Sequence, residues 1–101
     1  MFNAIIENNS AVDGGGVYVS MSSSINIYDS IIRGNEASRS GSAIYFVNTQ
    51  EVTSVVSNTT ITENYVAESG TIYSFYSRVD FDSVTLTSNY ADTDSPGMVL
   101  I

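Results

Sequence analysis

The chain has 101 residues, of which 43% are hydrophobic and 14% are charged, and its three basic residues against eleven Asp and Glu give a net charge of −8. Three cations cannot neutralise a run of phosphates, so we expect no nucleic-acid partner and no attraction to an anionic membrane surface. No apolar run approaches the roughly 18 residues of a membrane span, which predicts no direct membrane insertion.

Short apolar runs alternate with polar turns along the whole chain. The run from Ser24 to Asp29 alternates apolar and polar residues, which is the period of a half-buried strand. No segment has the 3.6-residue period and the caps of a helix, so we expect almost no helix. The expected strands, in chain order, are residues 1–6, 16–19, 24–29, 31–32, 43–47, 52–56, 71–73, 79–81 and 98–101.

One short pattern recurs four times. An Asn stands three residues after an Ile or Leu in the pairs Ile6 and Asn9, Ile32 and Asn35, Ile61 and Asn64, and Leu86 and Asn89. A Gly lies six residues after the first three of these Asn, at Gly15, Gly41 and Gly70, and an aromatic residue follows at Tyr18, Tyr45 and Tyr73. Successive Asn of this pattern are 25 to 29 residues apart. A repeat of this length defines the fold, because each repeat is one structural unit.

Repeated residues favour a parallel solenoid over an antiparallel sandwich. A sandwich pairs neighbouring strands through hairpins and has no reason to repeat identical residues at one period. A solenoid pairs each strand with its equivalent one coil later, so like residues stack on like. We therefore predict an all-β, right-handed parallel β-helix of about four coils, roughly 19 Å long at ~4.8 Å per coil. The coils comprise approximately residues 1–23, 24–51, 52–78 and 79–101 of a single domain.

This stacking assigns a role to each recurring residue type. The Ile and Leu residues form an interior aliphatic ladder, and the Tyr residues are expected to form an interior aromatic one. Asn suits a turn because it tolerates the left-handed backbone region, and stacked Asn side chains can bond one another from coil to coil. The Gly residues allow tight folding where a Cβ would clash.

The pairing of an apolar-x-x-Asn element with a Gly-x-Ala-Ile-Tyr element resembles the repeats of chlamydial polymorphic outer-membrane proteins and of similar bacterial and protist surface proteins. Their signatures are Phe-x-x-Asn and Gly-Gly-Ala-Ile/Leu/Val. Residues 41–45 are the closest copy, residues 14–18 are near, residues 70–73 lack the Ala, and residues 95–99 depart furthest. Ile or Leu replaces Phe throughout. The resemblance implies the pectin-lyase-like β-helix and a surface or adhesive role.

Parallel β-helices often cleave acidic polysaccharides, so the carboxylates need attention. Asp80 and Asp82 flank Phe81 and are expected to point outward, with Asp92 and Asp94 twelve residues further along the chain. Stacked together they would bind Ca²⁺ weakly, but a solvated acidic surface explains them better. The chain has no His or Lys to act as a base and no Cys, so we expect no catalysis and no cofactor.

Two further features concern the surface. Arg33 and Arg39 are expected to approach Glu7 and Asp13 of the preceding coil, in ion pairs worth roughly 0–1 kcal/mol each. The sequons beginning at Asn8 and Asn58 would carry N-glycans in a secreted eukaryotic protein, although composition alone accounts for two sequons. The Tyr residues would form a platform for sugars only if they faced outward.

These observations together predict a structural role. We expect an extracellular or cell-surface stalk, adhesin segment or fibril subunit, with a carbohydrate-binding module and a non-catalytic fragment of a polysaccharide lyase or hydrolase as alternatives. The N-terminal residues show no signal peptide, which suggests a mature part or a piece of a longer protein. Both ends consist of core-like strands, so we expect them to be covered by neighbouring coils of a longer chain or by end-to-end self-association.

Overall fold

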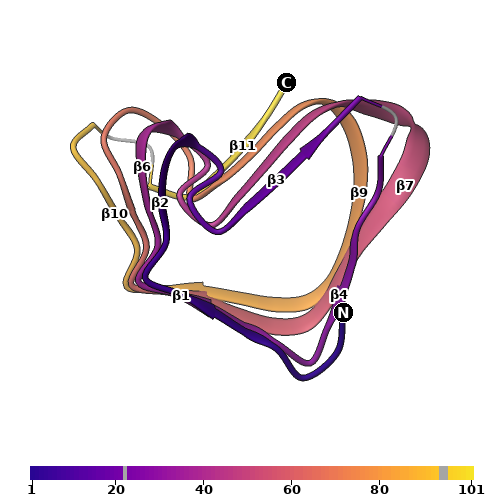
Figure 1. Ribbon diagram of the computed structural model, residues 1–101, viewed down its shortest axis with the longest axis horizontal. Coiled ribbons are helices and arrows are strands. Elements are labelled where there is room, and N and C mark those ends of the chain that lie inside the picture. The colour runs from indigo at the N-terminus through magenta and orange to yellow at the C-terminus, as the bar shows by residue number, and fades with distance from the viewer. Residues whose placement is uncertain (22, 94–95) are drawn as a thin grey trace.

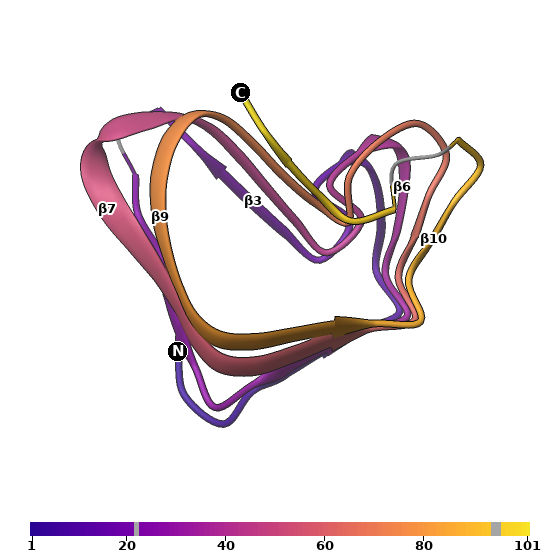
Figure 2. The same ribbon diagram turned by 180° about the vertical axis from the view of Figure 1, so that it is seen from behind.

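The computed structural model describes residues 1–21, 23–93 and 96–101 and is a right-handed parallel β-solenoid of about four coils. Figure 1 looks down the stack of coils, and the chain turns clockwise as it recedes from the viewer; Figure 2 shows the same stack from behind. The shortest extent of the molecule is 19 Å, in agreement with the stack height expected from four coils. No helix occurs among the described residues.

Eleven strands make up the coils. They are β1 (Ile5–Glu7), β2 (Ser10–Asp13), β3 (Val17–Ser20), β4 (Asn26–Tyr28), β5 (Ile31–Arg33), β6 (Glu36–Ser40), β7 (Ile44–Thr62), β8 (Tyr65–Val66), β9 (Ile72–Thr87), β10 (Tyr90–Ala91) and β11 (Met98–Leu100). We expected separate short strands, but β7 and β9 each run through corners where a break was predicted. A bend in a strand therefore replaces a loop at these corners.

All strand pairs are parallel and fall into two sheets. The larger sheet has seven strands and the order β1-β5-β7-β9-β11, with β3 and β4 also paired to β7, and the smaller sheet has the order β10-β8-β6-β2. The register between β7 and β9 shifts between Thr49 and Thr53, because Thr49 pairs with Ser77 whereas Thr53 pairs with Arg78. The coil that contains β7 therefore takes up its extra residues at this one corner.

The core is a set of apolar columns inside the coil. The fully buried large apolar side chains all belong to the middle of the stack and are Ile27, Ile32, Ile44, Phe46, Val56, Ile61, Val66 and Ile72. Burying one such side chain contributes about 1.5–3 kcal/mol, so these columns supply the main driving force for folding. Inward residues of the outer coils, such as Ile6 and Leu86, are only half-buried.

Each coil turns two of its corners with a residue in the left-handed backbone region. At one corner these residues are Asn8, Gly34, Glu63 and Ser88, with φ between 55° and 63°. At the other they are Asn3, Asp29, Asn58 and Ser83, with φ between 47° and 56°. The break expected between the strands of residues 24–29 and 31–32 lies at this second corner. The same backbone solution is repeated in every coil, and this lets the strands between the corners keep one register.

Candidate functional site

The Asn residues of the repeat form a continuous hydrogen-bonded column. Asn35 and Asn64 are 1% and 0% exposed, respectively. The backbone N–H and the Nδ2 of Asn35 both donate to Oδ1 of Asn64, at 2.9 and 3.1 Å, and a second Nδ2 hydrogen goes to the carbonyl of Ile6 at 3.1 Å. The expected bonding between stacked Asn side chains is confirmed.

The same bonds link the outer members of this Asn column. The backbone N–H and the Nδ2 of Asn9 donate to Oδ1 of Asn35, both at 3.1 Å. Asn64 donates in the same way to Oδ1 of Asn89, at 3.0 and 3.1 Å. The side chain of Asn35 therefore uses two donors and accepts two bonds, which is the full capacity of an amide.

We expected the Asn residues of the column to occupy the left-handed turn position themselves, because Asn tolerates that conformation. This prediction is wrong. The residue before each Asn occupies this position instead: Asn8, Gly34, Glu63 and Ser88 have positive φ, and the four column Asn do not. The turn before it aims the Asn side chain inward, where its amide group donates through Nδ2 and accepts through Oδ1. The selection for Asn at this position comes from the hydrogen-bonded column and not from backbone strain.

The aliphatic column beside the Asn column is also confirmed. Ile6 pairs with Ile32, Ile32 with Ile61, and Ile61 with Leu86. Ile32 and Ile61 are fully buried. The carbonyl groups of Ile32 and Ile61 accept from the Nδ2 groups of Asn64 and Asn89, so the apolar and polar columns hold each other in register.

The Tyr column is stacked as expected, but it faces outward, so the prediction of an interior aromatic ladder is wrong. Tyr18 is 54% exposed, whereas Ile44 and Phe46, on either side of Tyr45, are 0% exposed. Neighbouring residues of a strand face opposite sides, so filling the interior with Ile44 and Phe46 turns Tyr45 outward. Ring centroids lie 5.2 Å apart between Tyr18 and Tyr45 and 5.3 Å apart between Tyr45 and Tyr73.

The glycine column contains Gly14 and not Gly15, which corrects the predicted alignment. Gly14, Gly41 and Gly70 have φ of 67°, 66° and 78°, whereas Gly15 has no positive φ. A Cβ on Gly41 would lie 2.6 Å from the carbonyl oxygen of Ile44, so only glycine fits this turn. Gly15 is small for another reason, because its Cβ would lie 2.4 Å from the carbonyl oxygen of Glu36 in the next coil.

A second column of buried hydroxyl groups was missed by sequence reasoning. The Oγ of Ser30 accepts from the backbone N–H of Ala4 at 3.2 Å, and Oγ1 of Thr59 accepts from that of Ser30 at 3.4 Å. Both side chains are at most 3% exposed. Their shared position in the repeat could have identified this column, because Ser30 and Thr59 each stand two residues before the Ile of the Asn repeat.

Both expected ion pairs between coils are present. The Nε of Arg33 lies 2.7 Å from Oε2 of Glu7, with both side chains more than 40% exposed. The Nε of Arg39 donates to Oδ1 of Asp13 at 3.0 Å, and its Nη2 pairs with the second carboxylate oxygen. The hydrogen bond to Asp13, followed by the charge of that carboxylate, raises the pKa of Arg39 above its ordinary value.

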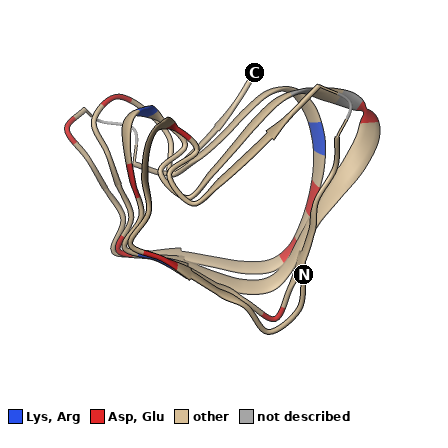
Figure 3. Ribbon diagram, in the orientation of Figure 1, with Lys and Arg blue, Asp and Glu red and all other residues tan. Residues whose placement is uncertain are grey.

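The carboxylates considered for Ca²⁺ do not come together. Asp80 and Asp82 are exposed on β9, and within the described residues no group of three or more His, Cys, Asp and Glu is placed to hold a metal ion. Asp92 instead accepts a hydrogen bond from the hydroxyl of Tyr65, which raises the pKa of that Tyr. Asp94 lies outside the described residues. Figure 3 shows acidic residues spread around the perimeter of the coil.

The Asn residues of both sequons are exposed and lie at the left-handed corners. Asn8 and Asn58 have φ of 58° and 47°, respectively. The Nδ2 of Asn58 donates to Oδ1 of Asp29 of the preceding coil at 2.7 Å, while the next residue, Thr59, is buried in the hydroxyl column. A glycan at Asn58 would therefore replace one surface hydrogen bond between coils.

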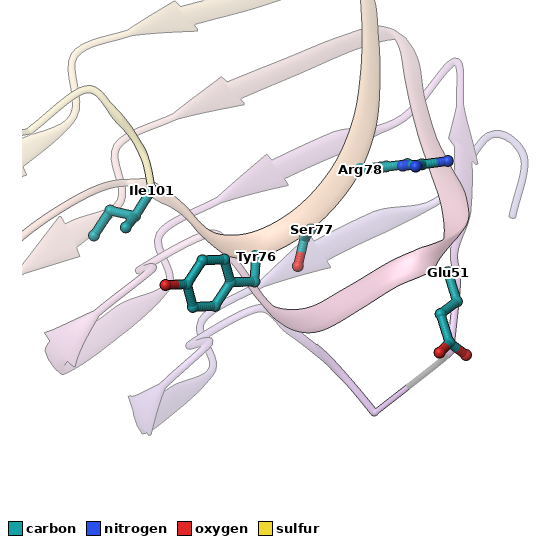
Figure 4. Close-up of a pocket in the computed structure, with 5 residues that line it drawn as sticks. All are labelled: Glu51, Tyr76, Ser77, Arg78 and Ile101. Carbon is teal, nitrogen blue, oxygen red and sulfur yellow. The ribbon is translucent and has the colours of Figure 1, made fainter.

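A shallow surface pocket of about 620 Å³ lies at the corner where β7 and β9 bend. Its lining residues are Glu51, Tyr76, Ser77, Arg78 and Ile101. Figure 4 shows Tyr76 and Ile101 on one side and Arg78 and Glu51 on the other, so these side chains do not converge on one point. Among these lining residues Glu51 is the one carboxylate side chain.

The fold and its columns define the chain as a parallel β-solenoid. Comparison with protein-family models, with curated proteins and with solved structures found no match. Among the described residues, no helix has the length and apolar character required to span a membrane.

Proposed function

We propose that this chain is a non-catalytic structural segment of an extracellular or cell-surface protein, acting as a stalk, an adhesin segment or a fibril subunit. The Asn column is the observation that carries this proposal. Its buried amide groups are used entirely for contacts between coils, with Asn35 bonded on both sides along the stack. A solenoid whose buried polar side chains bond to the equivalent side chains of neighbouring coils is suited to extending along one axis.

The outer coils support the same proposal. Met98 and Leu100 of β11 pair with the inward-facing Ile72 and Ser74, yet they are 37% and 64% exposed. Ile6 in β1 is likewise only half-buried. A further coil, either from the same polypeptide or from a second copy of the chain, would bury these side chains and pair the strand edges.

Composition and the repeat resemblance support the location. Ser, Thr and Asn dominate the polar residues and Lys is absent, as in many secreted surfaces, and both sequon Asn residues are exposed. The resemblance to the repeats of chlamydial polymorphic outer-membrane proteins supports the proposal of a pectin-lyase-like β-helix at a cell surface. Labelling of intact source cells with an antibody raised against the chain tests this location.

Sedimentation velocity combined with electron microscopy tests the structural role. The 101-residue chain is expected to form rods whose length grows in steps of about 19 Å, the shortest extent of one molecule. Leu100→Lys places a charge at the open end of the stack and should abolish the rods, whereas Ser38→Lys, on the exposed side of β6, should leave them intact. A folded monomer at micromolar concentration would contradict the stacking of separate copies.

A carbohydrate-binding module remains the second proposal, because the Tyr column faces outward. Sugars stack on free aromatic faces, but the rings of Tyr18, Tyr45 and Tyr73 lie against one another with interplanar angles of 14° and 7°. Both faces of Tyr45 are therefore covered by neighbouring rings, whereas among the residues that the structure describes Tyr18 stacks on one side only. Glycan-array binding that is lost in Tyr45→Ala would favour this module over the structural role.

The third proposal, a fragment of a polysaccharide lyase or hydrolase, has less support. The chain has no His or Lys, and Arg33 and Arg39 are engaged in ion pairs. We therefore expect no release of reducing ends or unsaturated products from a panel of polysaccharides. Turnover that disappears in Asp82→Ala would overturn the non-catalytic assignment.

A further inference from the structure

The outward Tyr column differs from every other aromatic contact in the described part of the chain. Tyr18, Tyr45 and Tyr73 are successive Cα partners across β3, β7 and β9. Their rings form two stacked phenol pairs in one line, with centroids 5.2 and 5.3 Å apart. The other ring contacts pair a phenol with a phenyl ring, as in Phe2 with Tyr28 and Phe75 with Tyr76.

One end of this column is open to reagents in solution. Tyr18 is 54% exposed, whereas Tyr45 and Tyr73 are partly covered by their neighbours. An oxidising enzyme or reagent in solution therefore reaches the column first at Tyr18. Each ring lies directly against the next, so a radical formed on one phenol has a second phenol in contact with it.

We propose that the Tyr column is a site of oxidative cross-linking, in which a haem peroxidase with hydrogen peroxide couples Tyr18 to Tyr45, or Tyr45 to Tyr73, as dityrosine. Each phenol loses one electron and one proton to give a phenoxyl radical. The two radicals join through ring carbons ortho to oxygen, and the two ring hydrogens return to the oxygens. Two phenols and one peroxide thus give one dityrosine and two waters.

The fold favours coupling within the column over coupling elsewhere. Two rings already held in contact react without a diffusional encounter and need only side-chain rotation. Tyr65 and Tyr90 are also Cα partners, but the hydroxyl of Tyr65 is bound to Asp92 and no stacked contact between the two rings is present in the described structure. We therefore expect the stacked pairs to couple before the unstacked one.

The cross-link would join neighbouring coils covalently. A bond between Tyr18 and Tyr45 closes a loop of 27 residues, counted as the difference of their positions, in a chain that has no cysteine. Such a bond constrains the unfolded state in the way that a disulfide does. The inference is independent of the proposed structural role, because it needs only the folded coil.

Trypsin mapping after oxidation tests the proposal directly. Cleavage after Arg33, Arg39 and Arg78 gives fragments 1–33, 34–39, 40–78 and 79–101. The dilute folded chain, treated with horseradish peroxidase and hydrogen peroxide, should yield dityrosine fluorescence and a covalent 1–33/40–78 fragment pair. A Tyr45–Tyr73 bond should appear as fragment 40–78 lighter by two hydrogens and should disappear in Tyr73→Phe.

Two substitutions within residues 1–33 test whether coupling requires a phenol in the Tyr column or only an exposed phenol. Tyr18→Phe keeps an aromatic ring in the column but removes its phenol, and it should abolish the 1–33/40–78 pair. Tyr28→Phe is the matched control, because Tyr28 stacks on Phe2, and it should leave the pair unchanged. In denaturant the yield of the pair should fall by about tenfold or more, because proximity is lost.

Mixing chains with and without ¹⁵N distinguishes coupling within one molecule from coupling between two. The proposal predicts cross-linked pairs that carry a single isotope composition. Pairs of mixed composition as the main product, survival of the pair in Tyr18→Phe, or an equal yield in denaturant would each overturn it. If the chain cross-linked in its folded state also has a higher thermal midpoint than the unoxidised chain, the constraint on the unfolded state is supported.

Discussion

The Asn column and the Tyr column repeat at similar intervals along the chain, but they lie in opposite environments. Asn35 is 1% exposed and fully hydrogen-bonded, whereas Tyr18 is 54% exposed and makes ring contacts. The more polar residue type is thus the buried one. Burial follows from what stacking can satisfy, because an amide repeated in register donates to and accepts from itself, whereas a row of phenols gains mostly ring contact.

The largest expected effect comes from placing a charge in the Asn column. Asn35→Asp replaces the Nδ2 donor by an oxygen that faces Oδ1 of Asn64 and the carbonyl of Ile6. We expect a loss of about 3–5 kcal/mol in the free energy of unfolding, the usual cost of an uncompensated buried charge. Urea denaturation monitored by circular dichroism measures it.

The pH dependence of this variant provides its internal check. Burial raises the pKa of the introduced carboxyl above its unfolded value, so the folded state binds the proton more tightly. The variant should be most stable below the unfolded pKa of Asp, about 3.9, and should lose stability as the pH rises through the folded pKa. A loss that does not change with pH would contradict burial of the charge.

Removing the amide without adding charge should cost less. Asn35→Ala leaves the acceptors and donors of Asn9, Asn64 and Ile6 without their partner, at about 1–3 kcal/mol. Asn9→Ala is the matched control, because Asn9 is exposed and should lose only about 0.5–1 kcal/mol. Equal losses in the two variants, measured by urea denaturation, would show that burial does not decide the contribution of the column.

The Tyr column should respond more weakly. Tyr45→Ala removes two ring contacts, each worth about 0.5–1.5 kcal/mol, and part of that is recovered because Tyr18 becomes solvated; we expect a net loss of about 1–2 kcal/mol. Tyr45→Phe keeps both rings stacked and should lie within a few tenths of a kcal/mol of the original chain. A Phe variant as unstable as the Ala variant would assign the stability to the hydroxyl group.

Raising the pH into the alkaline range should affect the Tyr column but not the Asn column, because only the phenols can lose a proton. Burial, followed by the charge of Asp13 and the neighbouring phenols, raises the pKa of Tyr45 above 10.0. A raised folded pKa means that the folded state holds the proton, so the stability is complete below pH 10 and declines as the pH rises through the folded pKa. Tyr45→Phe, which has no ionisable hydroxyl group at this position, should flatten this decline in thermal-melting experiments.

The smallest expected effect concerns the ion pairs on the outer surface. A double-mutant cycle on Glu7 and Arg33 should give a coupling of about 0.2–1 kcal/mol, because both side chains are more than 40% exposed. The coupling should fall when the ionic strength is raised to about 1 M, where screening acts over about 3 Å. A larger coupling that persists in high salt would indicate an ion pair shielded from solvent.

Stacking was predictable from the sequence because identical residues at one interval have to meet in a parallel solenoid. The Asn column, the aliphatic column and the pairs of Arg33 with Glu7 and Arg39 with Asp13 follow from that register alone. The direction of the Tyr side chains did not follow. Ile44, Tyr45 and Phe46 are all apolar, so the pattern allows either face.

The backbone conformations were predicted less well, for a physical reason. The left-handed corner before each column Asn holds Asn8, Gly34, Glu63 and Ser88, four residue types with no common side-chain chemistry. The coil geometry imposes this left-handed conformation, and the packing around the corner offsets its energetic cost. No residue pattern therefore marks the position. Aligning Gly15 with Gly41 failed similarly, because neighbouring glycines in residues 14–16 make the register ambiguous.

The hydrogen bonds that join one Asn of the column to the next all run in one direction. In every step, the amide and backbone N–H of one Asn donate toward the coil that follows it in the sequence, from Asn9 to Asn35, then to Asn64 and Asn89. The two ends of this chain of Asn-to-Asn bonds are therefore chemically different: Oδ1 of Asn9 faces outward along the stack at one end, and the backbone N–H of Asn89 does so at the other. Any filament built by continuing this column is polar, with all units pointing the same way, and a two-fold symmetric pairing of ends would set donors against donors or acceptors against acceptors.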